Sequence, residues 1–296
     1  MLDVRRLRLL RELALRGTIA SVAEALSFSP SAVSQQLSAL EREAGVPLLE
    51  RTGRSVRLTP AGHTLVEHAE AVLARLERAE ADLVDVRAGL SGPVRVGAFP
   101  SATRAIVPGA LRALAAEHPG LVPMVLEVDP ADVGDALRAG ELDVALVHDY
   151  DFVPFPTEPG IDDEPLCAEA MYLASTTPPT EPGLAAWRDA PWIVASPGTR
   201  CHAMTVRACQ AAGFTPDIRH RIDDFDTVLR FVAAGQGVAL VPELGALNET
   251  VVLTEVALCR RTRIAYRAGA GGHPAVRATC RALVTGTAGQ PGARPR

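Results

Sequence analysis

The chain has 296 residues, which suggests about two domains, and 48% hydrophobic with 22% charged residues is an ordinary globular composition. All 30 basic residues are arginine, so chemistry that needs a lysine, such as a Walker phosphate loop or a Schiff base, is excluded. The net charge of −5 by itself counts against a nucleic-acid partner. The charges are unevenly distributed along the chain, however, so each segment has to be considered separately.

The positive charge is confined to the N-terminal fifth of the chain. Residues 1–62 hold nine arginines and six acidic residues, whereas residues 63–92 and 93–296 carry net charges of −3 and −5. A basic segment on an acidic protein indicates a nucleic-acid-binding module. We expect no membrane span, because no run of about 18 apolar residues occurs, and no secretion signal. Five scattered cysteines without a Cys-x-x-Cys pair predict reduced thiols in the cytoplasm and no metal site.

Apolar residues at helical spacing predict three helices in the basic segment, over residues 3–16, 18–26 and 30–44. Thr18 and Ser29 are the expected N-caps of the second and third helices, with Pro30 at the first position of the third. The polar face of the third helix lacks the usual mixture of charges and carries Ser31, Ser34, Gln35 and Ser38. Short hydrogen-bonding side chains on the second helix of such a pair suit base edges and phosphates in a major groove.

A β-hairpin is expected next, because two short apolar runs within residues 46–58 flank a Thr-Gly turn. Arg51, Arg54 and Arg57 lie in this hairpin. A basic hairpin beside a helix pair is typical of a wing whose arginines contact phosphates or the minor groove.

The first 62 residues resemble the LysR-type transcriptional regulators. The resemblance rests on ordered segments, namely residues 18–26, 29–37 (Ser-Pro-Ser-Ala-Val-Ser-Gln-Gln-Leu), 40–41, 45–51 and 58–62. Leu49 and Thr18 stand where the family usually has Phe and Ser, which preserves packing and capping. The resemblance implies a sequence-specific regulator rather than an enzyme. Its expected DNA contacts are Thr18, Ser29, Pro30, Ser31, Ser34, Gln35, Ser38, Arg51, Arg54 and Arg57.

Residues 60–88 predict one long helix capped by Thr59. An apolar stripe in alternating steps of four and three residues, typical of a two-helix seam, is formed by Leu65, Ala69, Val72, Leu76, Ala79, Leu83 and Val86. The alternative is that the helix packs only on its own domain. We expect a homodimer through this helix, or a tetramer, and a hinge at residues 89–93.

Residues 93–285 show alternating strands and helices, which predicts βαβ units and a mostly parallel sheet. Strands are expected at 94–98, 122–128, 143–147, 171–175, 192–195, 218–222, 237–241 and 260–266. Helices are expected at 102–118, 130–139, 200–212, 227–234 and 274–283. Residues 149–165 look like a long surface connection, and the Gly-, Pro- and Arg-rich residues 286–296 like a disordered tail.

The expected fold is therefore α/β, with an N-terminal winged helix-turn-helix (1–62), a linker helix and hinge (63–92) and an effector-binding domain (93–285). The family resemblance implies that this last domain is similar to a periplasmic solute-binding protein. The first lobe would comprise about 93–167 and 263–285, and the second about 168–262.

A small effector is expected beyond the carboxyl ends of the strands, where helices begin. Two such loops, one in each lobe, follow the strands expected at 94–98 and 192–195 and carry most of the candidate contacts. His148 directly follows the strand expected at 143–147 and is a further candidate. The candidates are Pro100, Ser101, Thr103, His148, Thr199, Arg200, Cys201 and His202. Hydroxyls, free N–H groups and arginines suit an anion, although ordinary helix capping also explains the hydroxyls. No cofactor is expected.

Other functions remain open at this point. Cys201 and Cys209 permit redox sensing, because a helix N-terminus can lower a thiol pKa, but eight residues on one helix are too far apart for a disulfide. An enzyme is disfavoured, since the sequence has no Gly-x-Ser-x-Gly elbow, dinucleotide glycine fingerprint or metal cluster. A plain solute-binding protein would not need the basic N-terminal module.

Overall fold

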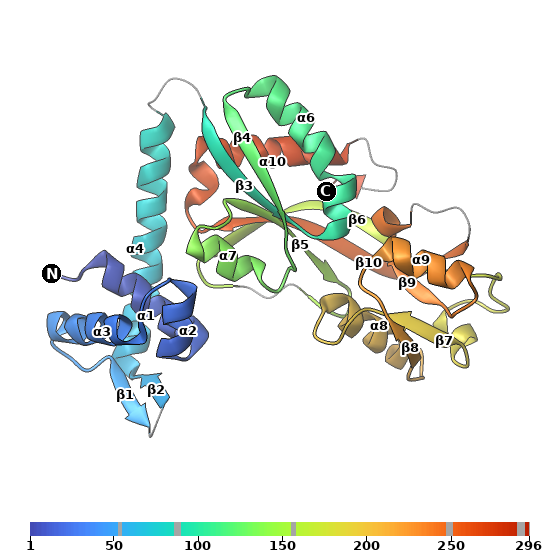
Figure 1. The fold of residues 1–296 in the computed structure, drawn as a ribbon, viewed down its shortest axis with the longest axis horizontal. Helices are drawn as coiled ribbons and strands as arrows, with labels where there is room; N and C mark the ends of the chain where they lie inside the picture. Colours follow the sequence, from blue (N-terminus) through green and yellow to red (C-terminus); the bar gives the residue numbers. More distant parts are fainter. Residues whose placement is uncertain (53–54, 86–89, 155–157, 247–250, 289–293, 296) are drawn as a thin grey trace.

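The computed structural model of the chain describes residues 1–52, 55–85, 90–154, 158–246, 251–288 and 294–295 (Figure 1). A helical domain with a β-hairpin lies at one end, and a long helix rises from it beside a larger α/β part. The predicted combination of a winged helix-turn-helix, a long linker helix and a two-lobed α/β domain is confirmed.

The N-terminal domain follows the sequence order closely. Its elements are α1 Val4–Arg16, α2 Ile19–Ala25, α3 Pro30–Ala44, β1 Leu49–Thr52, β2 Ser55–Leu58 and α4 Pro60–Asp85. The Thr18 hydroxyl accepts the backbone N–H of Ser21, and the Ser29 hydroxyl accepts that of Ala32, so both expected caps start their helices. The expected end of the long helix and the first residue of the expected hinge, residues 86–89, lie outside the described part of the chain.

The hairpin is fixed to α3 by a contact that the sequence alone does not reveal. One carboxylate oxygen of Glu41 accepts the backbone N–H groups of Leu48 and Leu49, each at 3.0 Å. The β1–β2 ladder is antiparallel, and Leu48 is buried with the apolar faces of α1, α2 and α3. This contact sets the position of the hairpin relative to α3.

One mixed sheet runs through the α/β part in the strand order β11-β6-β10-β5-β3-β4, and β9 pairs with β6. Its strands are β3 Gly92–Ala98, β4 Leu121–Glu127, β5 Val144–Tyr150, β6 Ile161–Ser175, β9 Ala239–Pro242, β10 Val252–Arg267 and β11 Arg294–Pro295. Strand β3 is parallel to β4 and β5, whereas β10 is antiparallel to β5 and β6.

The long strands β6 and β10 cross between two lobes. The first lobe adds α5 Pro100–Ala105, α6 Val107–Glu117, α7 Val133–Ala139 and α10 Pro274–Thr287 to β3, β4 and β5. The second adds β7 Pro191–Val194, α8 Arg200–Ala211, β8 Asp217–Arg221 and α9 Phe225–Ala233 to β9. Short 3₁₀ helices lie at Leu184–Trp187, Glu243–Gly245 and Ala270–Gly272.

The sequence of strand β5 begins with a continuous run of apolar residues and does not alternate between apolar and polar ones. Val144 and Leu146 join the core under α6 and α10, whereas Ala145 and Val147 join a second core under α7. A strand covered on both faces has a continuous apolar run in its sequence. Its carboxyl end, from residue 148 to 150, lies at the boundary between the lobes.

The helix expected over 102–118 is instead two helices, α5 and α6, which meet at Ile106. Pro108 is the second residue of α6 and has no N–H to donate to the preceding turn. The chain therefore turns at this point, and Phe99, Ala102 and Ile106 become buried together.

The long connection expected over 149–165 is shorter in the structure, because β5 continues to Tyr150 and β6 begins at Ile161. The acidic residues at the start of β6 concealed the strand. The Asp163 carboxylate forms an ion pair with Arg263 of β10, so these polar residues pair in the ladder instead of forming a loop.

The strand expected at 260–266 extends over the whole of β10, and residues 286 and 287, expected in the disordered tail, belong to α10. α10 continues to Thr287, and Gly286 packs closely against α6, where an added Cβ would lie 2.6 Å from the Ile106 carbonyl oxygen. Arg294 and Pro295 pair with Ala168 and Cys167 of β6. Residues 289–293 lie outside the described part of the chain.

Candidate functional site

The polar face of α3 is open to solvent. Ser31, Gln35 and Ser38 are exposed, Ser34 is half-buried, and the opposite face buries Val33, Leu37 and Leu40. Because one face holds the helix to its domain and the other is free, α3 can enter a groove without disturbing the core.

The hairpin places Arg57 on β2, with its side chain exposed. Arg51 lies on β1 and is paired in register with Val56, while Arg54 lies outside the described residues. Pro30 is exposed at the first position of α3, next to the Ser29 and Ser31 hydroxyls, which lie 3.0 Å apart. The hydroxyls of Thr18 and Ser29 hold the starts of their helices, which is the capping role expected of them.

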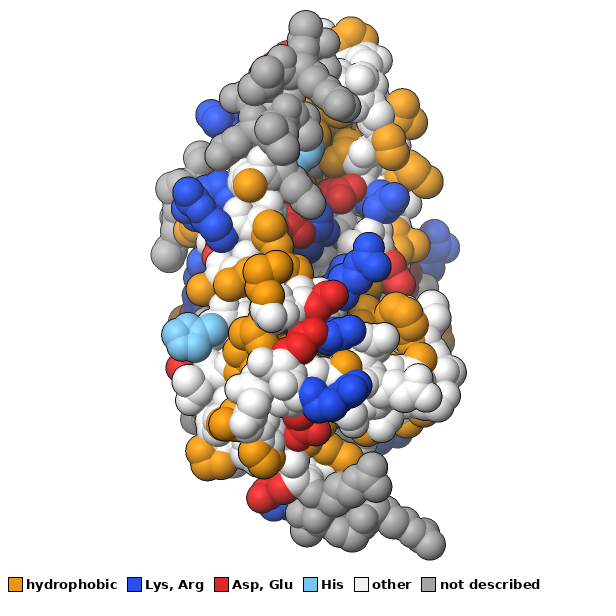
Figure 2. Space-filling model, turned by 90° about the vertical axis from the view of Figure 1, so that its left-hand side faces the viewer, with side chains coloured by type: hydrophobic (Ala, Val, Ile, Leu, Met, Phe, Trp, Pro, Cys, Tyr) orange, Lys and Arg blue, Asp and Glu red, His pale blue; other side chains and the backbone are white. Residues whose placement is uncertain are grey.

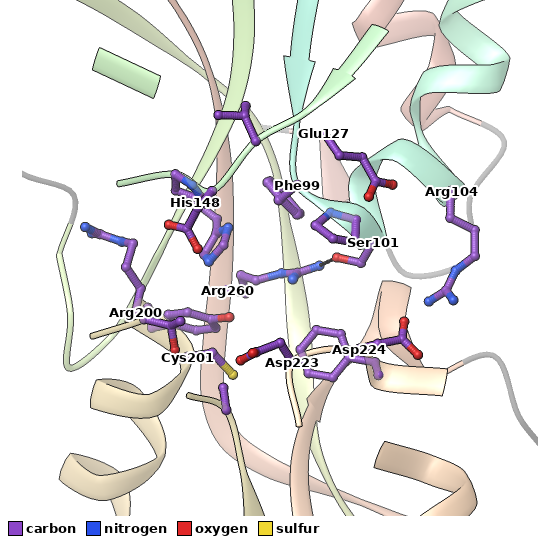
Figure 3. Close-up of a pocket in the computed structure, with 18 residues that line it drawn as sticks. Phe99, Ser101, Arg104, Glu127, His148, Arg200, Cys201, Asp223, Asp224 and Arg260 are labelled. Atoms are coloured by element: carbon purple, nitrogen blue, oxygen red, sulfur yellow. Dashed lines mark hydrogen bonds between the residues drawn. The ribbon is translucent and has the colours of Figure 1, made fainter. Parts of the chain in front are cut away.

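A cavity of about 630 Å³ lies between the two lobes (Figure 3). The expected residues that line it are Pro100, Ser101 and His148 from the first lobe and Thr199, Arg200 and Cys201 from the second. The first lobe contributes the start of α5, and the second the start of α8, where the Thr199 hydroxyl accepts the His202 backbone N–H. The structure thus brings two loops that are far apart in the sequence to one cavity.

Arg260 lines the same cavity and was missed as a site residue. It lies on the crossing strand β10 and is 1% exposed. Its guanidinium donates to the Glu169 carboxylate at 2.7 Å and to the Ser101 hydroxyl at 3.0 Å, and it stacks 5.0 Å from the centre of the Phe99 ring. The position of Arg260 at the start of a predicted strand was the signal that could have identified it, because an arginine buried in a strand needs polar partners.

Glu169 extends this connection to the 3₁₀ helix Glu243–Gly245, which follows β9. Its other carboxylate oxygen accepts the backbone N–H of Leu244 at 2.7 Å, and its side chain is fully buried. One chain of hydrogen bonds therefore runs from Ser101 on α5 through Arg260 and Glu169 of the two crossing strands to Leu244. A group bound against Ser101 would contact this chain directly.

His148 lines the cavity at the end of β5. It is 7% exposed, its ring packs edge-on against Phe99 and Tyr150, and its Nδ1 has no hydrogen-bond partner among the described residues. Burial, together with the charges of Arg260 and Arg200, holds the pKa of His148 well below its usual value. The imidazole is therefore neutral at pH 7, and no described residue uses the hydrogen-bonding capacity of its buried Nδ1.

Acid should consequently destabilise the folded chain through His148. Below about pH 6.5 the unfolded chain takes up a proton that the buried imidazole does not, so the free energy of unfolding falls by up to about 2 kcal/mol between pH 6.5 and 5. Urea unfolding at pH 7 and pH 5 measures this loss in the wild type and in His148→Gln. The variant should lose less stability than the wild type, and equal losses would contradict the assignment.

Cys201 also lines the cavity, but its pKa differs from the sequence expectation. Burial raises the pKa of the Cys201 thiol to about 11, and the opposing effects of the Arg260 charge and a hydrogen bond with Tyr150 are smaller. Burial raises the pKa of Cys209 to about 12 in the core of the second lobe. Desolvation therefore outweighs the lowering expected from the α8 N-terminus.

The cavity lining also carries charges of both signs (Figure 3). Arg104 forms an ion pair with Asp226 at 2.8 Å, and the Asp223 carboxylate accepts the backbone N–H and hydroxyl of Ser196. Asp224 caps α9. Asp223 and Asp224 thus hold segments of the second lobe, whereas the Arg104–Asp226 pair joins α5 of the first lobe to α9 of the second.

Thr103 and His202 are not among the residues that line this cavity. The Thr103 hydroxyl donates to the backbone carbonyls of Ala98 and Phe99. His202 Nδ1 lies 2.9 Å from the Ala195 carbonyl oxygen. Each side chain is turned back to the backbone at the start of its own helix.

Comparison with known proteins gives two adjacent family matches. Residues 4–63 match the bacterial regulatory helix-turn-helix protein, lysR family, and residues 87–288 match the LysR substrate binding domain. The chain belongs to the LysR family of bacterial regulators. Members of this family are transcriptional regulators and not enzymes.

Individual relatives agree with the family matches. The chain is 31% identical to a probable hydrogen peroxide-inducible genes activator of Streptomyces viridosporus, over 84% of this chain and 82% of the relative. It is similar in structure to an H2O2-bound mutant of OxyR from Corynebacterium glutamicum, at 26% identity and a TM-score of 0.58, covering 97% and 92% of the two chains. Full-length CbnR complexed with its target DNA shares the fold, at 23% identity and a TM-score of 0.53, covering 96% and 99%.

Among the described residues, no group of three or more His, Cys, Asp or Glu side chains is placed to hold a metal ion. No described helix has the length and apolar character needed to span a membrane.

Proposed function

We propose that this LysR-family regulator binds double-stranded DNA as a homo-oligomer and is controlled by a small molecule bound between the lobes. The polar face of α3 would read base edges, and the arginines of the β1–β2 hairpin would contact phosphates. Because DNA recognition requires access to the chromosome, we expect the protein to act in the cytoplasm.

The observation that carries the effector proposal is the cavity between the lobes. Residues chosen from sequence on both lobes meet around it, and they include a neutral His148 with an unpartnered nitrogen in the described part of the chain. Ser101, Thr199 and the backbone at the start of α8 offer hydrogen bonds, and Arg200 and Arg260 offer positive charge. This chemistry favours a small molecule with a carboxylate or another anionic group. Ligand-dependent closure would then change the spacing of the DNA-binding domains in the oligomer.

The long helix α4 supports oligomerisation. Ala69 is fully buried in the core of its own N-terminal domain, so the start of the apolar stripe has an intrachain partner. Further along, Val72 and Leu76 are 40% and 41% exposed, while Val86 lies outside the described residues. Figure 2 shows the side of the molecule on which α4 lies in Figure 1, where hydrophobic side chains lie among arginines and acidic residues. The middle of the seam is thus available to a second copy of the helix.

The function is tested with the full-length protein in two steps. Genomic DNA fragments retained by the protein should share a sequence, and their affinity should fall with salt. A metabolite library screened by thermal shift should contain anionic compounds that stabilise the wild type but not Ser101→Ala. If no DNA is preferred, the proposed regulator function fails. If DNA is preferred but binders act equally on Ser101→Ala, only the effector site is wrong.

A second candidate is oxidant sensing, because relatives of this chain carry the name of hydrogen peroxide-inducible activators. Cys201 is a cysteine of the cavity wall. Against this role stand its raised pKa and the position of Cys209 on the same helix, two turns away in the core. A protonated thiol reacts slowly with peroxide, because the thiolate is the nucleophile.

Cys201 should accordingly be alkylated slowly. With a pKa of about 11, its thiolate fraction at pH 7.5 is roughly 300-fold below that of an ordinary cysteine. Iodoacetamide labelling followed by peptide mass spectrometry measures the rate, with the half-buried Cys259 as an internal comparison. A DNA affinity that changes with peroxide in the wild type, but not in Cys201→Ser, would instead establish the redox candidate.

A further inference from the structure

A second cavity, of about 360 Å³, lies where the N-terminal domain meets the first lobe. We name it the junction cavity. Its walls come from α1, α4, the end of α7 and the end of β10, so both domains contribute. In Figure 1 these elements meet on the side of α1 that is turned away from the β1–β2 hairpin. The DNA-contacting surface proposed above is therefore separate from it.

The junction cavity is strongly basic. Five arginines and two glutamates line it, namely Arg5, Arg8, Arg11, Arg138, Arg267, Glu70 and Glu77. Three of the arginines recur at every third position of α1 and share one helix face. These three arginines carry positive charge of the N-terminal domain that lies outside both α3 and the β1–β2 hairpin.

Some of these charges are neutralised inside the protein. Arg267 pairs with Glu77 at 2.9 Å, and Arg138 pairs with Asp135 and Glu158. Arg8 is different, because its guanidinium donates to the Arg138 backbone carbonyl at 2.7 Å. Within the described residues, no carboxylate lies within 4.0 Å of the Arg5 or Arg8 guanidinium. Two cations therefore remain available at the wall formed by α1.

Unsatisfied polar atoms mark the same place. Arg11 and Arg138 are each only 7% exposed, yet the Nε of each has no hydrogen-bond partner among the described residues. Arg11 Nε lies 4.0 Å from Glu70 Oε1, which is also without a hydrogen-bond partner in the described part of the chain. The Nε donors of Arg11 and Arg138 lack an acceptor and Glu70 Oε1 lacks a donor, so a further polar group is needed in this cavity.

We propose that the junction cavity binds a small polyanion, a molecule with two or more negative charges from phosphate or carboxylate groups. Guanidinium groups bind such groups through paired N–H donors, and Arg5 and Arg8 supply them from one domain. Ala139 and Gly140 form part of the wall in the first lobe. A ligand held between these walls stabilises the arrangement in which α1 and α4 pack on the first lobe, and so links a second chemical signal to the position of the DNA-binding domain.

The test uses the full-length protein and inorganic pyrophosphate as the probe, at constant ionic strength. Calorimetry and thermal shift should show saturable binding to the wild type, about tenfold or more weaker in Arg5→Ala/Arg8→Ala. Ala139→Glu, which places a carboxylate in the first-lobe wall, should weaken binding similarly. The control Arg112→Ala/Arg230→Ala removes the same charge from exposed helix positions and should bind as the wild type does.

Three results would overturn the proposal. A response that does not saturate, or that sodium chloride reproduces, would reduce the effect to ionic screening. Unchanged affinity in Ala139→Glu would place the anion on α1 alone. Loss of pyrophosphate binding in Arg57→Ala, with retention in Arg5→Ala/Arg8→Ala, would assign it to the hairpin. Circular dichroism and gel filtration establish that each variant is folded, and either wall variant suffices if the other does not fold.

Discussion

Replacing Glu169 by alanine should lower the free energy of unfolding of the α/β domain by about 3–5 kcal/mol. The substitution leaves the Arg260 guanidinium, only 1% exposed, without its ion-pair partner, and it also removes the acceptor for the Leu244 backbone N–H. Urea denaturation followed by circular dichroism measures this loss. A protein with the stability of the wild type would show that the pair is not buried in solution.

A double variant distinguishes the cost of an isolated charge from the value of the pair itself. Glu169→Leu/Arg260→Met removes both charges and nearly keeps the volume, so it should be considerably more stable than Glu169→Ala. The same variant should still lose its response to a ligand in the cavity between the lobes, because Arg260 no longer joins Ser101 to Glu169. A double variant that is stable but no longer responds to the ligand would indicate that the Arg260–Glu169 pair serves regulation and not folding.

Replacing Gln35 by alanine should weaken binding to the selected DNA site by about 1–3 kcal/mol, which is roughly five- to 150-fold. Gln35 is exposed on the polar face of α3, where an amide can make two hydrogen bonds to a base edge. Fluorescence anisotropy should show that affinity for unrelated DNA is almost unchanged. The matched control is Gln36→Ala, since the Gln36 side chain accepts a hydrogen bond from Arg6 within the domain. Equal losses in both variants would contradict the assignment of the polar face.

Arg57→Ala should behave differently from Gln35→Ala. An arginine that contacts a phosphate contributes to all sequences, so affinity should fall uniformly. The slope of log affinity against log salt concentration should decrease by about one. A loss restricted to the selected site would mean that Arg57 reads bases.

The N-terminal domain could be predicted from its sequence because its signals are local. Capping residues and a proline at the first helical position act within one turn, and the structure uses Thr18, Ser29 and Pro30 in this way. The continuous apolar run in β5 likewise reflects its burial on both faces. Such features need no knowledge of distant residues.

The parts that could not be predicted depend on tertiary contacts. The Arg260–Glu169 pair joins residues 91 positions apart, and only the sheet register brings them together. The acidic start of β6 looks like a loop until Arg263 is placed beside Asp163. The pKa of Cys201 rises because folding buries it, which sequence neighbours do not reveal. The sequence suggests no role for Arg5, Arg8 and Arg11 of α1, because the opposite wall of the junction cavity is formed by distant residues of the first lobe.

The most direct test of the proposed regulator is a hydroxyl-radical footprint of the full-length protein on its selected DNA, with and without a cleft ligand. We expect two protected half-sites separated by whole helical turns, each lost in Gln35→Ala, and a ligand-dependent change in their spacing or occupancy. Uniform protection without half-sites, unaffected by Gln35→Ala, would contradict DNA reading by α3 in a ligand-controlled oligomer.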